Sequence, residues 1–493
     1  MKNMKNMKNM KNTIRIVLLT MSIVFIYSSC NDSFLDKAPL NEASDATFYT
    51  KEADAVAAVN AVYDPMQWIA TYKININEVS NEFTNDLGLP RPDQFPSMFQ
   101  PTVTRELGVW SVFYMGINRA NIALIKIPEI EMDENLKVRL LAETKFLRGF
   151  YYYILTTFFG DIIIRDEPIT IDNLEKAKSP KSDIIDLVRK DLGDAIAGLP
   201  ERSDQATSDL GRATKGAAIA LLGKVELYEK NFAEAAILFK KVIDSQEYML
   251  NAEYGPQFND GGDNTPESIF EVQFVTNSGG AWGNESEGGY FSGWEGTTQD
   301  GFNYGFGAPH QPNQDFVDAY EVGDKRKDYT IVEDGDDYFG TPFNGGRSTT
   351  GYGFRKYIIP AALETGGAGD SGINHHIIRY ADVLLMYAEA QNETSDGPNT
   401  DALSAINLVR DRAGLNDLPS GLSKQDFFDA IVHERRIELF MEDHRLWDLI
   451  RWGLAPEVLG DFNGFVEGRH ETLPIPQSEI DNNSLMVQNP AYQ

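Results

Sequence analysis

The chain has 493 residues, and its 44 Lys and Arg residues against 74 Asp and Glu residues give a formal net charge of -30. Nucleic-acid-binding proteins need Lys and Arg to displace phosphate counterions, so this composition excludes that class. Hydrophobic residues make up 42% and charged residues 24%, which is typical of a globular protein and excludes intrinsic disorder and fibrous repeats. Cys30 is the single cysteine, so no disulfide can form within the chain.

The first thirty residues predict a secretory signal. Four lysines and Arg15 precede an almost entirely apolar run over residues 16–27. A helix of this run measures about 18 Å, too short for a hydrocarbon core of about 30 Å. Two serines then precede Cys30, which resembles a bacterial lipoprotein signal, although Tyr27 stands where that motif most often has leucine. We expect residues 1–29 to be removed and acylated Cys30 to hold the protein on a membrane; the alternative is an ordinary signal peptide with an incidental cysteine.

The spacing of apolar residues predicts a mainly α-helical protein after a tether at residues 30–45. Apolar side chains recur every three or four positions from an N-cap at Thr50 to Tyr63. They do so again from Glu134 to Phe159, where Gly160 ends the pattern. We expect a helical scaffold over about 46–250 and 375–493, with a loop-rich insert over about 251–374.

Two helical hairpins are predicted within this scaffold. Residues 213–250 carry Ile219, Leu222-Gly223, Ala235 and Phe239 at the spacing of a tetratricopeptide repeat, whose small residues let paired helices approach closely. A second hairpin spans residues 380–415, with a turn at 396–399. Because the two lie far apart in the sequence, a large segment must either interrupt the array or pack against it.

The insert differs from the scaffold in composition. Residues 276–310 contain no Leu, Ile or Val, yet seven aromatic residues are spread among ten glycines. Aromatic faces beside polar groups suit sugar rings, so these residues are candidates for a glycan platform. The alternative is that the rings pin the loops to the body, and both interpretations stay open. The named candidates are Trp282, Tyr290, Trp294 and Tyr304, and the pattern extends through Tyr338, Phe339, Phe343, Tyr352 and Phe354.

No catalytic motif stands out. His433-Glu434 begins like a zinc protease motif, but Ile437 occupies the position of its second histidine. Neither a nucleophile elbow nor a phosphate-binding glycine loop is present, and no carboxylate pair of a glycoside hydrolase can be singled out. The apolar residues of 431–450 keep helical spacing. We interpret the charged residues of the same segment as a structural ion network that pairs across helical turns.

No cofactor is expected. The acid-rich turns at residues 259–264 and 333–337 offer hard oxygen ligands for a structural calcium ion. Their spacing departs from the EF-hand pattern, so solvated loops are the other interpretation.

Several motifs together resemble the SusD/RagB family of Bacteroidetes outer-membrane lipoproteins, and the resemblance covers Cys30 to Gln493. Two departures are visible: Ile163 stands where the family usually has proline, and Asp443 where it usually has glycine. The motifs are ETKFLRGFYYYILTTFFGD from Glu143, RYADVLLMYAEAQNE from Arg379, AINLVRDRAGL from Ala405, HERRIELFMEDHRLWDLIRWG from His433, PIPQSEI from Pro474 and QNPAY from Gln488.

This resemblance implies a non-catalytic cell-surface protein that captures an oligosaccharide and delivers it to a SusC-like TonB-dependent transporter. It implies a body of four tetratricopeptide-like helix pairs with an irregular part that carries the ligand. Position in the chain points to the loop at residues 81–99, with Asn85, Asp86 and Arg91 as candidates, together with the aromatic insert. Part of the family takes up oligopeptides, so RagB-like peptide capture is the main alternative, and a glycoside hydrolase is a more distant one.

Overall fold

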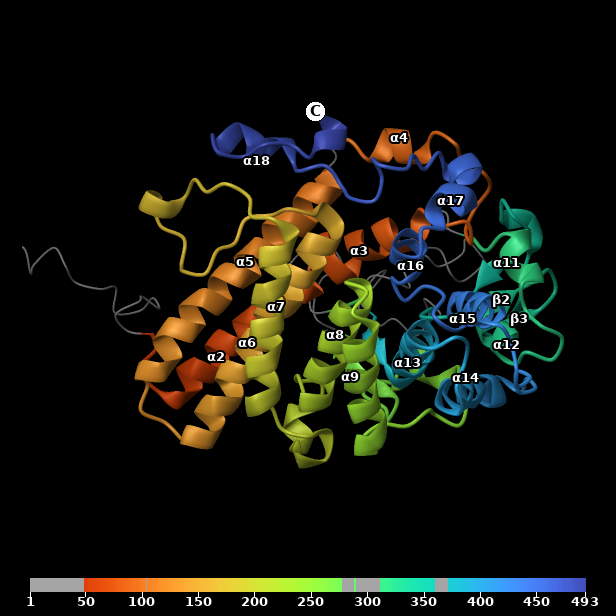
Figure 1. Ribbon diagram of the computed structural model, residues 1–493, viewed down its shortest axis with the longest axis horizontal. Helices are drawn as coiled ribbons and strands as arrows, with labels where there is room; N and C mark the ends of the chain where they lie inside the picture. Colours follow the sequence, from red (N-terminus) through yellow and green to blue (C-terminus); the bar gives the residue numbers. More distant parts are fainter. Residues whose placement is uncertain (1–47, 103, 277–287, 290–310, 360–370) are drawn as a thin grey trace, which may run out of the picture.

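The computed structural model describes residues 48–102, 104–276, 288–289, 311–359 and 371–493 (Figure 1). The described part is mainly α-helical, as predicted. Its helices are α2 (Glu52–Tyr63), α3 (Asn75–Asn77), α4 (Gln94–Met98), α5 (Thr104–Lys126), α6 (Glu134–Phe159), α7 (Lys181–Gly198), α8 (Lys215–Tyr228), α9 (Phe232–Ser245), α11 (Gln314–Asp318), α12 (Arg326–Thr330), α13 (Tyr380–Thr394), α14 (Thr400–Ala413), α15 (Lys424–Glu438), α16 (Arg445–Arg451), α17 (Ala455–Asn463) and α18 (Gln477–Asn482).

The long helices form one row in which each packs against the next (Figure 1). The row runs from α2 through α5, α6, α7, α8 and α9 to α13, which then contacts α14 and α15. The predicted hairpins are therefore confirmed as α8–α9 and α13–α14. Because α9 touches α13 directly, the intervening segment interrupts the array in sequence but not in space.

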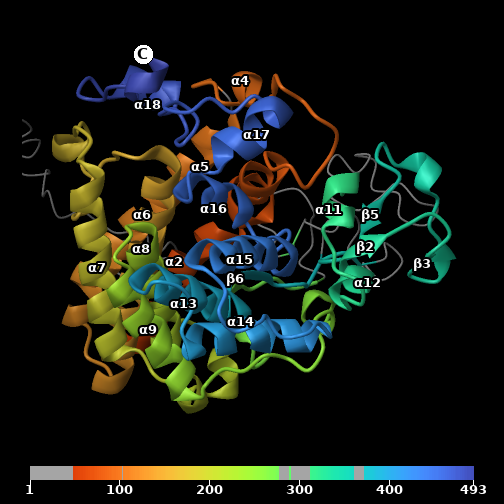
Figure 2. The ribbon, with the colours of Figure 1, turned by 45° about the vertical axis from the view of Figure 1, so that its right-hand side comes forward.

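The insert leaves and rejoins the array through a two-stranded antiparallel sheet. Strand β1 (Ser268–Val272) pairs with β6 (His375–Arg379), which leads directly into α13. Between them the described residues contain only short elements, and Figure 2 shows these gathered on one side of the helical row. The predicted boundaries near residues 250 and 375 stay a prediction. The short strands are β2 (Ile331–Val332) with β5 (Gly353–Phe354), and β3 (Asp337–Tyr338) with β4 (Thr341–Pro342).

Local interactions set the ends of the predicted helices. The side chain of Asp133 caps α6 by accepting from the backbone N–H of Leu136 at 2.9 Å, and Gly160 ends the helix with φ +74°. The limits predicted for this helix are confirmed. In α2 the N-cap is Lys51 rather than the predicted Thr50, because the carboxylate of Asp54 accepts from both N–H groups, of Thr50 at 2.9 Å and of Lys51 at 3.2 Å.

The helical spacing over residues 431–450 does not form one helix. α15 ends at Glu438, α16 begins at Arg445, and Met441 and Asp443 between them have φ values of +60° and +65°. Glycine adopts this left-handed conformation most readily, which fits the glycine that the family usually has at position 443. Asp443 adopts it in spite of its side chain. Its carboxylate accepts from Asn81 Nδ2 at 2.7 Å and contacts His375 Nε2 at 2.8 Å, interactions that glycine could not make.

Ile163, the second departure, makes use of an N–H that proline lacks. This buried residue donates its backbone N–H to the Tyr114 hydroxyl at 2.8 Å, while that hydroxyl donates to the Ile163 carbonyl at 2.7 Å. The pair fixes the chain after α6 against α5.

Among the described residues, every helix is too short or too polar to span a membrane. The main core fills the helical array, and a second cluster of buried apolar residues forms the core of the insert. We call this cluster the insert core; it consists of Leu87, Phe316, Val317, Ile331, Val332, Tyr338, Phe343, Phe354, Ile358, Ile437, Phe440 and Met441.

The close approach of α8 and α9 generates a prediction about Gly223. A Cβ atom there would lie 2.7 Å from Cε1 of Phe239, whose ring is fully buried. Gly223→Ala should therefore lower the free energy of unfolding by about 1–3 kcal/mol through overpacking. Gly193→Ala is the matched control, since this exposed position in α7 has open space around a Cβ, and it should gain about 0.5–1 kcal/mol. Urea unfolding of both variants tests this, and equal stabilities would contradict the packing argument.

Candidate functional site

The loop at residues 81–99 lies beside residues 311–313 of the insert. Leu87 and Pro312 form an isolated β-bridge, and the N–H of Gly88 donates to the carbonyl of Gln311 at 2.7 Å. Asn313 donates its side-chain amide to the Asn85 carbonyl at 2.7 Å. The loop that position in the chain had pointed to is therefore joined to the part of the insert that directly follows residues 290–310.

Gln311 connects this junction to a third segment of the insert. Its buried side-chain carbonyl accepts from the Ser348 hydroxyl at 2.6 Å and from the backbone N–H of Thr349 at 2.8 Å. No motif in the sequence singles out Gln311, because its role depends on partners thirty-seven and thirty-eight residues away.

A second anchor lies at Gly289 and Ser371. Each donates its backbone N–H to the other's carbonyl, at 2.6 and 2.9 Å. Gly289 directly precedes residues 290–310 and Ser371 directly follows residues 360–370, so the described residues that flank these two segments are held together.

The three polar candidates of the loop have different surroundings. Asp86 is buried, and its carboxylate pairs with Arg436 at 2.7 Å, so it stabilises the scaffold and is not exposed to a ligand. Asn85 is half-buried, and its Oδ1 is buried with no hydrogen-bond partner among the described residues. Arg91 is exposed, and its guanidinium lies 3.9 Å from the Glu82 carboxylate. Its backbone N–H donates to the carbonyl of Phe462 at 2.6 Å. Cys30, Trp282, Tyr290, Trp294 and Tyr304 lie outside the described residues.

The aromatic residues that follow the glycine-rich stretch divide into two groups. Tyr338, Phe343 and Phe354 are buried in the insert core, so the expectation of a surface platform is wrong for these three and they pin the loops instead. Phe339 is exposed and Tyr352 is half-buried.

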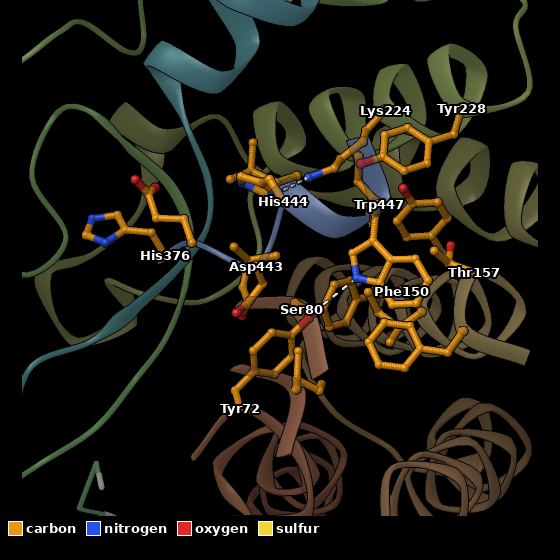
Figure 3. Close-up of a pocket in the computed structure, with 18 residues that line it drawn as sticks. Tyr72, Ser80, Phe150, Thr157, Lys224, Tyr228, His376, Asp443, His444 and Trp447 are labelled. Atoms are coloured by element: carbon orange, nitrogen blue, oxygen red, sulfur yellow. Dashed lines mark hydrogen bonds between the residues drawn. The ribbon is translucent and has the colours of Figure 1, made fainter. Parts of the chain in front are cut away.

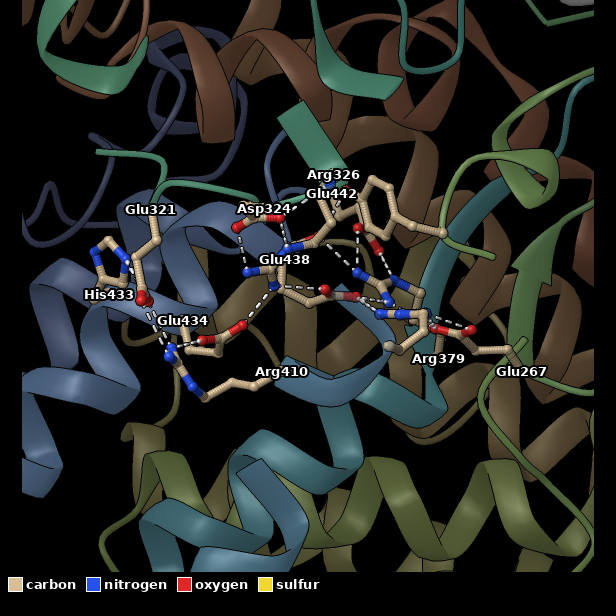
Figure 4. A network of polar contacts seen from close by, with 12 residues as sticks. Glu267, Glu321, Asp324, Arg326, Arg379, Arg410, His433, Glu434, Glu438 and Glu442 are labelled. Atoms are coloured by element: carbon tan, nitrogen blue, oxygen red, sulfur yellow. Dashed lines mark hydrogen bonds and ion pairs between the residues drawn. The ribbon is translucent and has the colours of Figure 1, made fainter. Parts of the chain in front are cut away.

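The predicted ion network is confirmed, but its reach is different from the prediction (Figure 4). Arg379, at the end of β6, is fully buried and pairs with Glu267 at 2.7 Å, Glu438 at 2.5 Å and Glu442 at 2.6 Å. Arg326 of α12 pairs with Glu438 at 2.9 Å. The charges therefore join separate elements rather than successive turns of one helix.

Electrostatics keep these carboxylates ionised. Burial alone would raise the pKa of Glu442, but the charges of Arg379 and Lys356 outweigh it and lower the pKa to about 2. The same balance, with Arg412 and Arg379 opposing burial, holds the pKa of Glu438 well below its usual value. The network is structural, because its buried carboxylates are paired with Arg and Lys side chains of other elements.

A mainly apolar cavity of about 50 Å³ lies between α6, α8, β6, α16 and the segment that follows α2 (Figure 3). Trp447 donates its indole N–H to the Ser80 hydroxyl at 3.0 Å, and Lys224 Nζ lies 3.1 Å from His444 Nδ1. Pockets that hold small ligands measure about 300–1,000 Å³. This cavity has room for water but not for a sugar ring.

Carboxylates of the two acid-rich turns accept hydrogen bonds from backbone N–H groups of the protein. Asp263 accepts from the N–H of Asn374 at 2.9 Å, and Asp334 from the N–H of Gly345 at 2.8 Å. Among the described residues, no group of three or more His, Cys, Asp or Glu side chains is arranged to hold a metal ion.

Comparison with known proteins places this geometry in a family. The family model described as "SusD family" matches residues 266–492, and the one described as "Starch-binding associating with outer membrane" matches residues 33–227. A solved laminarin-binding SusD-like protein is 31% identical, with a TM-score of 0.78 over 90% of this chain and 100% of that one. The chain belongs to the SusD family.

Two further relatives span nearly the whole chain. SusD-like protein P25 of Formosa agariphila is 25% identical over 536 residues, covering 96% of this chain and 98% of that protein. Surface glycan-binding protein A of Bacteroides thetaiotaomicron, solved in complex with laminarihexaose, shares the fold at 24% identity and a TM-score of 0.74, over 89% of this chain and 100% of its own.

His444 generates a prediction about acid stability. Burial, and then the charge of Lys224, lowers the pKa of His444 to about 3. The unfolded chain takes up this proton near pH 6.5 while the folded protein does not, so the free energy of unfolding should fall as the pH drops from about 6.5 towards 3. His444→Gln keeps an acceptor for Lys224 without titrating, so it should lose less stability between about pH 7 and pH 4.5. Urea unfolding at both pH values measures this, and parallel losses in the two proteins would contradict it.

Proposed function

We propose that this SusD family protein captures an oligosaccharide at the cell surface and delivers it to a SusC-like TonB-dependent transporter. The observation that carries the proposal is the 31% identity to a laminarin-binding SusD-like protein along 90% of the chain. The family description "Starch-binding associating with outer membrane" supports both a glycan ligand and attachment to the outer membrane.

The arrangement of the loops supports a ligand site near the Leu87–Pro312 and Gly289–Ser371 bridges. The Leu87–Pro312 bridge lies next to Asn85, which Asn313 contacts, and the Gly289–Ser371 bridge holds Gly289, a described residue of the aromatic stretch. The buried Oδ1 of Asn85, which has no partner among the described residues, is an acceptor that a sugar hydroxyl or an ordered water would satisfy. Trp282, Tyr290, Trp294 and Tyr304 are proposed to supply the aromatic faces, and Arg91 to contribute from the loop.

Two alternatives are less well supported. Peptide capture would favour an extended groove with backbone hydrogen-bond partners, and the composition of the insert favours sugars. Hydrolysis would require a positioned acid and base, and neither matched family description is that of an enzyme.

Replacing both Trp282 and Trp294 with alanine should remove glycan binding, because stacking on aromatic faces holds sugar rings. Calorimetry of the full chain in detergent against laminarihexaose, acidic oligosaccharides and a peptide pool measures the ligand, and thermal unfolding serves as the control. Unchanged melting with lost binding supports the platform. A large fall in melting temperature would instead make the two rings structural, and binding of peptides alone would overturn the proposal.

Replacing Cys30 with alanine should release the protein from the outer-membrane fraction, since the acyl chains carry the attachment. Cell fractionation followed by immunoblotting measures the partition, in cells that lack the partner transporter so that docking does not retain the protein. Cys30→Ser provides a second variant that also removes the acylated thiol. Continued membrane association of both variants would contradict lipid anchoring.

A further inference from the structure

A surface groove of about 520 Å³ lies within the insert, lined by residues that take no part in the two loop anchors. Its walls come from residues 255–259, from α12 and the residue before it, from the tip of the β3–β4 hairpin and from residues 355–356. The volume falls within the range of about 300–1,000 Å³ that ligand pockets occupy. Unlike the cavity beside His444, the groove is large enough for a sugar unit.

Phe339 stands at the tip of the β3–β4 hairpin in an unfavourable conformation. Tyr338 pairs with Thr341, so Phe339 and Gly340 form a two-residue turn, with φ values of +53° and +86°. Such turns favour Asn-Gly, and a bulky side chain at the first position is strained by about 1–3 kcal/mol. The ring of Phe339 is 37% exposed and lines the groove, whereas neighbouring Tyr338 is completely buried. The ring of Phe339 packs edge-on against that of Tyr338, with the two centroids 4.8 Å apart, so the insert core holds it where it lines the groove.

Tyr329 supplies a second ring whose orientation is fixed. A Cβ atom on Gly255 would lie 1.9 Å from Cδ1 of Tyr329, so the ring packs directly on the glycine backbone. The hydroxyl of Tyr329 donates to Glu253 Oε2 at 3.1 Å, which holds the ring from its other end. A pre-oriented aromatic ring loses little conformational entropy when it binds a ligand.

The charges of the groove differ from those of the whole molecule. Lys325 is exposed and forms no ion pair with a described residue. Arg355 donates to the carbonyl of Asp337, and its Nε is buried without a partner in the described part of the chain. Lys356 also lines the groove, but it is paired with Glu442 at 2.6 Å. Asp328 also lines the groove, and the Glu253 carboxylate lies against the Tyr329 hydroxyl, so Lys325 and Arg355 are two cations beside two acids on a protein of net charge -30.

We propose that this groove binds an acidic sugar unit of an oligosaccharide. Phe339 and Tyr329 pack against the pyranose ring, while Lys325 and Arg355 pair with its carboxylate or sulfate. The inference rests on the proposed glycan-binding function and narrows the ligand class to anionic glycans. The acidic surface as a whole repels such chains, but charges beyond about 8 Å are screened at physiological salt, so the direct contacts of Lys325 and Arg355 with the acidic group decide binding.

The test is calorimetry of the full chain in detergent with three probes: oligogalacturonate, a sulfated carrageenan oligosaccharide and neutral laminarihexaose. At least one acidic probe should bind, and its affinity should fall about tenfold or more between about 50 and 500 mM NaCl. The carboxylated and sulfated probes distinguish the two acidic groups. Failure of both acidic probes to bind would overturn the inference.

Phe339→Asn is the decisive variant, because asparagine suits this turn and removes only the ring. Its melting temperature should be equal to or above that of the wild type, while acidic-glycan affinity falls about tenfold. Lys325→Gln should weaken binding similarly, and Lys325→Arg, the matched control, should retain it.

Wild-type affinity for the acidic probe in Phe339→Asn and Lys325→Gln would overturn the inference. Retained laminarihexaose binding in those variants would show that the proposed capture function still holds, because the Trp282 and Trp294 variants test that function separately.

Discussion

The buried contacts of Arg379 are the constraint on which the arrangement of the insert depends. Arg379 is the last residue of β6, where the chain returns from the insert to the helical array. Its guanidinium pairs with Glu267, which directly precedes β1, with Glu438 at the end of α15 and with Glu442 after that helix. Burying so many charges is costly, and removing one partner from such a set costs about 3–5 kcal/mol because it leaves an unpaired buried charge. The network therefore has one low-energy arrangement, which fixes where the insert begins and ends.

The same network reaches into the insert and along the scaffold. Arg326 brings α12 to α15, and Arg412 brings α14 to Glu267 at 2.9 Å. A buried polar network rigidifies the elements that it joins. The insert core then packs on this base, with Ile437 and Phe440 on the scaffold side and Phe316 and Phe354 on the insert side. The loops that carry the candidate glycan surface are thus anchored to a rigid foundation.

The resemblance to the family was informative about the scaffold and much less so about the ligand. Asp443 and Ile163 depart from the family pattern, and each is explained by a contact to a distant residue, Asn81 in one case and Tyr114 in the other. The ligand surface has no such fixed pattern. Asp86, a candidate by position, is an interior ion-pair partner of Arg436, and its burial follows from a contact 350 residues away.

The sequence by itself determined the mainly helical class, the α8–α9 and α13–α14 hairpins, the limits of α6 and the structural character of the charges around Glu438. These follow from local periodicity and from capping groups a few residues apart. Only the tertiary structure decided that α9 meets α13, that Gln311 joins the loop at residues 81–99 to the insert, and that Tyr338, Phe343 and Phe354 are buried while Phe339 is exposed. An aromatic residue in a glycine-rich loop has the same local sequence whether it faces a core or a ligand. The distinction comes from long-range contacts, which no local pattern encodes.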